Sequence, residues 1–88
     1  MDAIRVEIPS QLFSYTHSRQ VEAHGATLDE ILRDLDRQFP GLRFRIVSEQ
    51  NQIRPHILIV IAKQPVRDLS TRIPETETVR IIGALSGG

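Results

Sequence analysis

In the first part of the chain, apolar and polar side chains alternate in two short stretches. Residues 3–8 alternate, and a period of two is typical of a strand with one buried face. Residues 20–24 alternate more weakly and predict a second strand, which pairs with the first as a hairpin. Between them, residues 12–18 are predicted to form a loop whose two aromatic side chains, Phe13 and Tyr15, pack on the edge of the core.

A helical periodicity follows these two strands. Thr27 is a favourable N-cap, and Glu30, three residues later, completes a capping box. Apolar residues then recur at intervals of three and four, which places them on one face of a helix of about three turns. Pro40-Gly41 ends the helix. The apolar face consists of Leu28, Ile31, Leu32, Leu35 and Phe39.

The second half of the chain contains further stretches with strand character. Residues 56–62 are nearly all aliphatic and mostly β-branched, which predicts a strand. Residues 78–85 predict the last strand, and residues 66–69 predict a short additional one between them. The pattern of residues 42–47 fits a helical turn and an extended segment equally well.

The order of these elements predicts an α+β fold in a single domain over residues 1–88. A mixed sheet of four to five strands would carry one helix across one face. We expect the first and last strands to lie side by side in this sheet.

One helix covers only one face of the predicted sheet, yet the strand at residues 56–62 is apolar on both faces. A contiguous apolar patch on a small protein usually marks an interaction surface. Alternatively, residues 12–18 or residues 42–47 cover part of this face. The side chains expected to point away from the helix form a candidate partner-binding surface, here named the open-face patch: Leu58, Val60, Ile82 and Ala84.

Composition and charge exclude several classes of protein. The 11 Lys and Arg residues balance the 11 Asp and Glu residues, so binding to nucleic acid through counterion release is not expected. The chain has no cysteine, which excludes disulfides, thiolate metal sites and a cysteine nucleophile, and we expect no metal site. The first residues lack the apolar core of a signal peptide, and the longest apolar run, residues 57–62, is too short to span a membrane. These features favour a cytoplasmic protein without membrane contact.

The sequence ends in Gly-Gly shortly after the last predicted strand. Because Gly87 and Gly88 have no Cβ, their backbone can approach a partner closely and adopt conformations that other residues cannot. We therefore interpret residues 84–88 as a flexible tail that enters a narrow site, with the Gly88 carboxylate at its end. Chain ends are commonly disordered, and the alternative is that the two glycines have no function.

Four stretches of the sequence match the pattern of a known protein family. Residues 25–32 (GATLDEIL) match the opening of its helix, and residues 39–43 (FPGLR) match the end of that helix. Residues 53–57 (IRPHI) match the lead into its central strand, and residues 79–88 (VRIIGALSGG) match its last strand and tail. Over its whole length, the chain resembles the β-grasp sulfur carriers of the MoaD/ThiS family, which are relatives of ubiquitin.

The sequence departs from the family's frequent pattern at several positions. Residues 62–64 (AKQ) stand where many members have Asn-Gly, and residues 75–78 lack the glycine of a frequent acidic turn. Gly83 replaces a frequent proline, and Leu85 and Ser86 replace smaller residues. These departures weaken the assignment to a subfamily but leave the terminal Gly-Gly intact.

The resemblance implies that the chain is a protein cosubstrate with no catalytic residue and no bound cofactor. An E1-like adenylating enzyme would use ATP to convert the Gly88 carboxylate to an acyl-adenylate, and a sulfur donor would replace AMP to give a thiocarboxylate. Ser86 and Gly87 would form the slim approach to this group. A biosynthetic enzyme would accept the sulfur for a molybdopterin precursor, a thiazole precursor or an activated amino acid on the way to cysteine. The Arg54-Pro55 lead-in favours a chain like the small subunit of molybdopterin synthase.

The sequence leaves three alternatives. A ubiquitin-like modifier would use the same Gly88 adenylate to form an isopeptide bond, and Lys63 is the only lysine of this chain. A non-catalytic interaction domain would still bind its partner after deletion of the tail. An enzyme would need side chains such as those of His17, His24 and His56, but no two of these histidines have the i, i+4 spacing of a helical site, and no catalytic motif is present.

Overall fold

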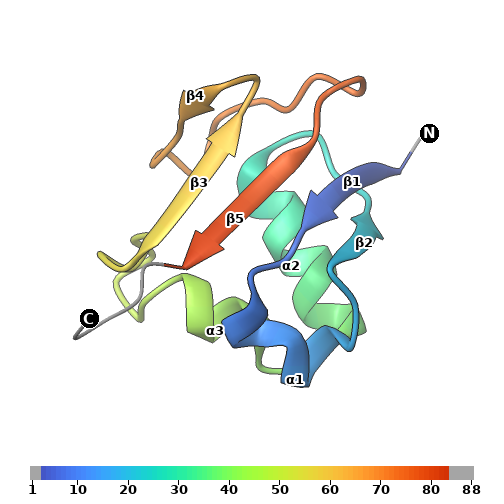
Figure 1. Ribbon diagram of the computed structural model, residues 1–88. Coiled ribbons are helices and arrows are strands. Elements are labelled where there is room, and N and C mark those ends of the chain that lie inside the picture. The colour runs from blue at the N-terminus through green and yellow to red at the C-terminus, as the bar shows by residue number, and fades with distance from the viewer. Residues whose placement is uncertain (1–2, 84–88) are drawn as a thin grey trace.

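A five-stranded mixed sheet dominates the fold, which is known from a computed structural model that describes residues 3–83 (Figure 1). The strands lie in the order β2-β1-β5-β3-β4. Their bounds are β1 Ile4–Glu7, β2 Gln20–Ala23, β3 Ile57–Ile61, β4 Gln64–Pro65 and β5 Val79–Gly83. The helical segments are the 3-10 turn η1 Ser10–Leu12 and the α-helices α1 Phe13–Thr16, α2 Leu28–Gln38 and α3 Leu42–Ile46.

Two neighbouring strands inside the sheet, β1 and β5, come from opposite ends of the described chain. β1 pairs antiparallel with β2 over all four residues of each strand, which confirms the predicted hairpin. On its other side, β1 pairs in parallel with β5 through Val6 opposite Val79 and Glu7 opposite Arg80. The first and last strands therefore lie side by side, as expected. β3 pairs antiparallel with β5, and the two-residue β4 forms the far edge.

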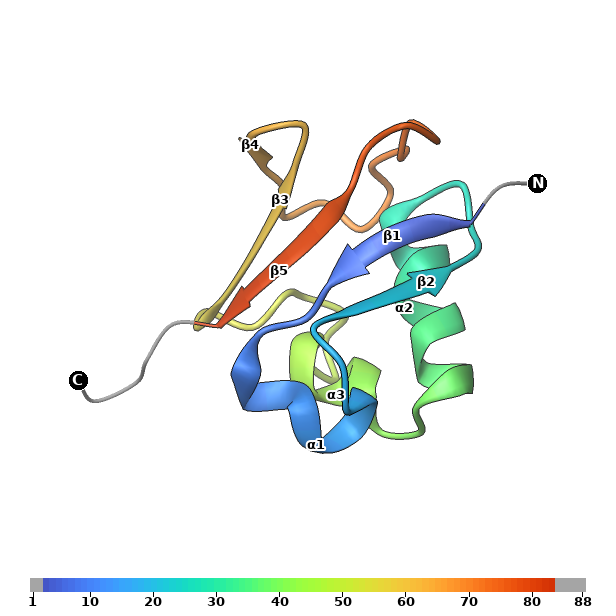
Figure 2. The same cartoon turned by 45° about the vertical axis from the view of Figure 1, so that its right-hand side comes forward.

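α2 lies across one face of this sheet (Figures 1 and 2). At its N-terminus, the Thr27 hydroxyl accepts a hydrogen bond from the Glu30 N–H at 3.2 Å. The Glu30 carboxylate accepts from the Ala26 N–H at 2.6 Å, so the capping box closes one residue earlier than predicted. Each large aliphatic side chain buried by the helix contributes about 1.5–3 kcal/mol. Those fully buried are Leu28, Ile31, Leu32 and Leu35.

The inner face of the sheet supplies the other half of the core. Along β3 and β5, buried side chains alternate with more exposed ones, because successive residues of a strand point to opposite faces. This alternation confirms which side of each strand faces the helix. The buried strand residues include Ile4, Val6, Ile59, Val79 and Ile81.

Residues 12–18, predicted as a loop, are mostly helical instead. Leu12 is buried in the core, and Phe13 and Tyr15 pack against it, as expected for the aromatic pair. The Phe13 carbonyl accepts from the His17 N–H at 2.7 Å, and this single turn ends at His17 with a left-handed φ of 55°. One turn is too short to show a helical periodicity, which is why the sequence pattern did not reveal it.

Residues 42–47, for which the pattern allowed two conformations, adopt both in succession. The segment from Leu42 to Ile46 is helical, with both of these side chains buried. Val47 is extended and forms an isolated bridge with Ile53 across a polar turn.

The additional strand predicted at residues 66–69 was wrong in position, because β4 already occupies Gln64–Pro65. Ala62 and Lys63 have φ values of 53° and 66°, so both central residues of the β3–β4 turn are left-handed. A two-residue turn of this kind has type I′ geometry and returns the chain directly into the next strand. Neither alanine nor lysine favours this conformation, so the residue types did not indicate the turn.

Candidate partner-binding face

The sheet face opposite α2 carries the described part of the open-face patch. Leu58 on β3 lies directly opposite Ile82 on β5, and these two residues are 41% and 44% exposed. Val60 is half-buried on the same face, where it lies opposite Arg80. The orientation predicted for these three side chains is therefore confirmed, while their role in binding a partner stays a prediction. Ala84, the fourth member of the patch, lies outside the described residues.

The segments that could have covered this face leave Leu58 and Ile82 exposed. Residues 12–18 and residues 42–47 both direct apolar side chains into the core shared with α2. Figure 2 shows α1 and α3 on the same side of the sheet as α2. Within residues 3–83, neither segment covers the Leu58–Ile82 pair.

The same face changes from apolar to charged toward β1. Arg80 lies between Val60 on β3 and Glu7 on β1, and its Nε is 3.3 Å from Glu7 Oε1. Both charged side chains are exposed, so this ion pair contributes little to stability. A partner that covers the whole face would therefore need an apolar region beside a polar one.

β5 ends at Gly83, which pairs with Ile57 at the start of β3. The side chain of Gln11 reaches this point from η1, and its Nε2 donates a hydrogen bond to the Gly83 carbonyl at 3.0 Å. Gly83 is the last residue that the structure describes. The remaining candidate site residues, with the predicted adenylation site, lie outside the described part of the chain: Ser86, Gly87 and Gly88.

A further exposed apolar side chain, Phe44 on α3, was not singled out from the sequence. It is 52% exposed, and the guanidinium carbon of Arg54 lies 4.6 Å from the centre of its ring. Arg54 Nε also donates to the Phe44 carbonyl at 2.8 Å. The Ile57 N–H donates to the Arg54 carbonyl at 2.9 Å, which ties this stack to the start of β3. The spacing of Leu42 and Ile46, one helical turn apart, was the signal that could have placed Phe44 outward.

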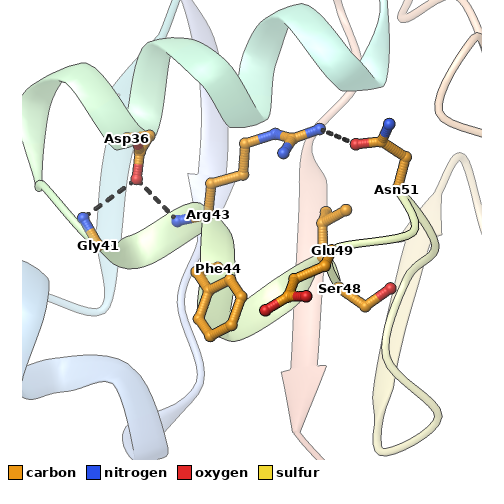
Figure 3. A pocket seen from close by; sticks show the side chains of 8 residues that line it. Asp36, Gly41, Arg43, Phe44, Ser48, Glu49 and Asn51 are labelled. Atoms are coloured by element: carbon orange, nitrogen blue, oxygen red, sulfur yellow. Dashed lines mark hydrogen bonds between the residues drawn. The ribbon is translucent and has the colours of Figure 1, made fainter.

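A shallow hollow is lined by α3 and the turn that follows it, with Asp36 of α2 at one side (Figure 3). The Asp36 carboxylate accepts hydrogen bonds from the N–H groups of Gly41 and Arg43, each at 3.1 Å. One terminal nitrogen of Arg43 bonds to Asp29 at 2.9 Å and approaches the Asn51 side-chain oxygen at 3.5 Å. Among the buried side-chain nitrogen and oxygen atoms of residues 3–83, only Arg43 Nε has no hydrogen-bond partner. These contacts join α2 to the start of α3, so the polar residues around the hollow have a structural role.

Two carboxylates of α2 are held ionised by their neighbours. A hydrogen bond from Arg33 is the largest influence on the pKa of Asp29 and lowers it. Partial burial opposes this effect, and Arg43 adds to the lowering, so the pKa lies below its ordinary value. Partial burial acts to raise the pKa of Asp34, but hydrogen bonds led by the His24 N–H outweigh it and lower that pKa. Both residues therefore serve the packing of α2 and show no sign of acid–base chemistry.

The three histidines do not come together as a site. His17, His24 and His56 are all exposed, and within residues 3–83 none donates or accepts a hydrogen bond through its side chain. In that same part of the chain, no group of three or more His, Cys, Asp or Glu residues could hold a metal ion. The helices described there are also too short or too polar to cross a membrane.

Comparison with known proteins places this geometry in a family. No protein-family model and no curated protein matches the sequence. A chain of the BexX/CysO complex of Amycolatopsis orientalis is 30% identical, with a TM-score of 0.88 over 98% of this chain and 100% of that one. CysO of Mycobacterium tuberculosis is 27% identical, with a TM-score of 0.86 over 93% of this chain and 99% of that one. SAMP1 of Haloferax volcanii, at 19% identity, a TM-score of 0.82 and coverage of 98% and 99%, shows likeness of fold.

A β-grasp sheet with an open face, matched along nearly the whole length of a CysO chain, defines a ubiquitin-like carrier protein. The chain belongs to the β-grasp sulfur carriers of the MoaD/ThiS type. The fold class and the resemblance predicted from the sequence are thereby confirmed. The structures that it matches are small carrier proteins rather than enzymes.

Proposed function

We propose that the Gly88 carboxylate is the group that carries the sulfur. The match to a CysO chain at 30% identity over 98% of this sequence supports this proposal, because the sequence also ends in Gly-Gly. An E1-like enzyme would bind ATP and the tail, and a Gly88 oxygen would attack the α-phosphorus with release of pyrophosphate. A sulfide equivalent would then attack the acyl carbon and displace AMP, which leaves a thiocarboxylate.

In this scheme the chain supplies a substrate rather than a catalytic group. A terminal carboxyl group has a pKa of about 3.3–3.7, so at neutral pH it is ionised and ready to attack. ATP binds to the activating enzyme, and the chain itself holds no cofactor. Gly87 and Gly88, which lack Cβ atoms, would let the tail enter a narrow site, and Ser86 would precede them.

The open-face patch would dock on the activating enzyme and hold the chain while the tail reacts. Leu58 and Ile82, both more than two-fifths exposed, would form its centre, with Val60 and Ala84 beside them. The relative CysO has been solved in a complex with BexX. By analogy, a biosynthetic enzyme that accepts the sulfur would be a second partner of this chain.

The acceptor of the sulfur is open among three chemical classes. The Arg54-Pro55 lead-in supports a molybdopterin precursor and a role as the small subunit of molybdopterin synthase. The two solved structures of 30% and 27% identity contain CysO, in one case in a complex with BexX. Deletion of the gene separates the classes, because loss of molybdoenzyme activity, of thiamin or of cysteine would each point to one acceptor.

The experiment that tests the proposal uses the absence of cysteine. The protein is incubated with ATP, an adenylating enzyme from the same organism and a sulfur source, then treated with a thiol alkylator and weighed intact. An alkyl adduct on the C-terminal peptide would identify a Gly88 thiocarboxylate, since the chain contains no other thiol. A variant without Gly88 is the control. Oxidation of Met1 adds nearly the same mass as exchange of oxygen for sulfur, so the adduct is the deciding signal.

A modifier function would give a different result in the same assay. Pyrophosphate exchange without an alkyl adduct would favour transfer of Gly88 to a lysine amine. Lys63→Arg then tests self-conjugation, because it keeps the positive charge and removes the chain's only lysine amine. Absence of exchange with any adenylating enzyme would leave an interaction domain whose Gly-Gly has no role.

A further inference from the structure

Gln11 contacts the end of β5 across 72 positions of the sequence. We propose that Gln11 is a positioning residue. It fixes the end of β5, and so the position and direction from which the segment carrying Gly88 enters the adenylating enzyme. This proposal rests on the proposed function of Gly88. It assigns to Gln11 no contact with ATP or with the reacting carboxylate.

The side chain of Gln11 approaches the backbone of Gly83 closely. Glycine within a strand weakens it and often marks a place where another group approaches the backbone closely. Gly83 does not have the left-handed φ that would require glycine. A Cβ at Gly83 would lie 3.0, 3.1 and 3.2 Å from the Oε1, Cδ and Nε2 atoms of Gln11. The Gln11 amide therefore lies next to the place where a side chain at residue 83 would begin, and a Cβ there would push the amide aside by a few tenths of an ångström.

The path of β1 explains why the Gly83 carbonyl is bonded by a side chain and not by the β1 backbone. The parallel pairing of β1 with β5 ends at Glu7 opposite Arg80. The next N–H, that of Ile8, donates to the Arg19 carbonyl at 2.7 Å, and Pro9 has no N–H. β5 thus extends beyond its pairing with β1, and Gln11 supplies the hydrogen bond to its last carbonyl.

η1 holds Gln11 in place for this contact. Leu12, its neighbour, is buried in the core, and the Leu12 N–H donates to the Pro9 carbonyl at 2.9 Å. The Phe13 N–H donates to the Ser10 carbonyl, which closes the turn on both sides of Gln11. Gln11 itself is exposed, so its amide stands on a fixed backbone rather than in the packed core.

When the end of a strand is fixed, the residues that follow it lose less conformational entropy on binding in an enzyme's site. A hydrogen bond of this kind contributes a factor of about 2 to 10 in an equilibrium constant. We therefore expect loss of the Gln11 amide to lower kcat/KM for adenylation by about 3- to 10-fold. Most of the change should appear in the KM for this protein, because Gln11 does not act on the chemical step.

Gln11→Leu removes the donor at similar size, and Gly83→Ala displaces the amide from the other side. Gln20→Leu is the matched control, since Gln20 is exposed on β2 and its side chain makes no hydrogen bond within residues 3–83. The amide order parameters of residues 83 and 84 are measured by ¹⁵N relaxation in each protein. Pyrophosphate-exchange kinetics are measured on the same samples, with the melting temperature as a check of folding.

We expect lower order parameters and a higher KM in Gln11→Leu and Gly83→Ala, with kcat and the melting temperature close to those of the wild type. Unchanged order parameters in both variants would overturn the proposal. Lower order parameters with an unchanged KM would also overturn it, because the contact would then serve only the fold. If the wild type itself exchanges no pyrophosphate, the proposed function of Gly88 fails, and the relaxation data still decide whether Gln11 fixes the strand end.

Discussion

Leu58 and Ile82 face each other across the antiparallel pairing of β3 and β5, and they are 41% and 44% exposed. The Cβ atoms of directly opposed residues lie about 4.5–5.5 Å apart, so the two side chains form one continuous apolar surface. The solvent face of an antiparallel sheet is ordinarily polar. Two large aliphatic residues at one such position are not needed by the core, and they are the basis for the proposed partner-binding role of the open-face patch.

Leu58→Glu is expected to weaken binding to the adenylating enzyme by at least about 10-fold, because it places a charge at the centre of the proposed interface. The fold should survive, since the side chain points away from the core. Titration calorimetry with the enzyme measures the affinity. Gln20→Glu, which makes the same change of charge on the exposed side of β2, is the control. Equal affinities of wild type and Leu58→Glu would remove the open-face patch from the binding mechanism.

Gly25→Ala is expected to destabilise the domain by about 1–3 kcal/mol. A Cβ at Gly25 would lie 2.7 Å from Glu30 Cβ and 2.9 Å from the backbone nitrogen of Ile31, so the start of α2 would have to move. Urea denaturation measures the change in the free energy of unfolding. A variant as stable as the wild type would show that α2 adjusts at no cost and that this close approach is not a constraint.

Replacing Ala62-Lys63 with Asn-Gly is expected to stabilise the domain by about 1 kcal/mol. Both residues now have left-handed φ values, of 53° and 66°, which asparagine and glycine adopt more easily. For a chain of this size, the melting temperature should rise by about 4–8 °C. Calorimetric melting measures the shift, and Lys63→Gly alone should give part of it. A lower melting temperature in the double variant would contradict the type I′ geometry.

Asp29 is expected to make stability depend on pH in the acid range. The hydrogen bond from Arg33, with the contribution of Arg43, lowers the pKa of Asp29 in the folded state below its value in the unfolded state. The stabilisation is then complete above the ordinary aspartate pKa and is lost as the pH falls through the lowered folded pKa. Urea midpoints between about pH 6 and pH 2 should therefore fall less steeply in Asp29→Asn than in the wild type.

The control for this pH series is Glu49→Gln, because the Glu49 side chain makes no hydrogen bond or ion pair within residues 3–83. Its midpoints should follow those of the wild type. If Asp29→Asn also followed them, the two arginines would not stabilise the ionised carboxylate, and the acid dependence would come from other groups.

The elements that could be predicted from the sequence are those whose periodicity extends over enough residues. The apolar stripe of α2 and the alternation of β1 and β3 gave the correct faces, and the Leu58–Ile82 surface followed from that alternation. η1 and α1 were missed because each spans about one turn. β4 was misplaced because its position depends on a turn whose two residues, Ala62 and Lys63, adopt an unfavourable conformation.

The contact of Gln11 with Gly83 shows a different limit of sequence reasoning. The residues are 72 positions apart, and only the parallel pairing of β1 with β5 brings η1 to the end of β5. A glycine near the end of a predicted strand is consistent with a close contact, but the sequence does not identify the residue that makes it. The exposure of Phe44 could not be predicted either, because it depends on residues 42–46 being helical and the sequence pattern did not decide that.

The central place of β5 has a consequence for protein synthesis. β5 is the last of the five strands to leave the ribosome, yet in the sheet it lies between β1 and β3. A nascent chain that lacks it cannot join the β1–β2 hairpin to the β3–β4 hairpin, and both would expose unpaired edges. Chains truncated before β5 would therefore be left to chaperones and proteases, and only a chain that includes β5 could fold and bind the proposed activating enzyme.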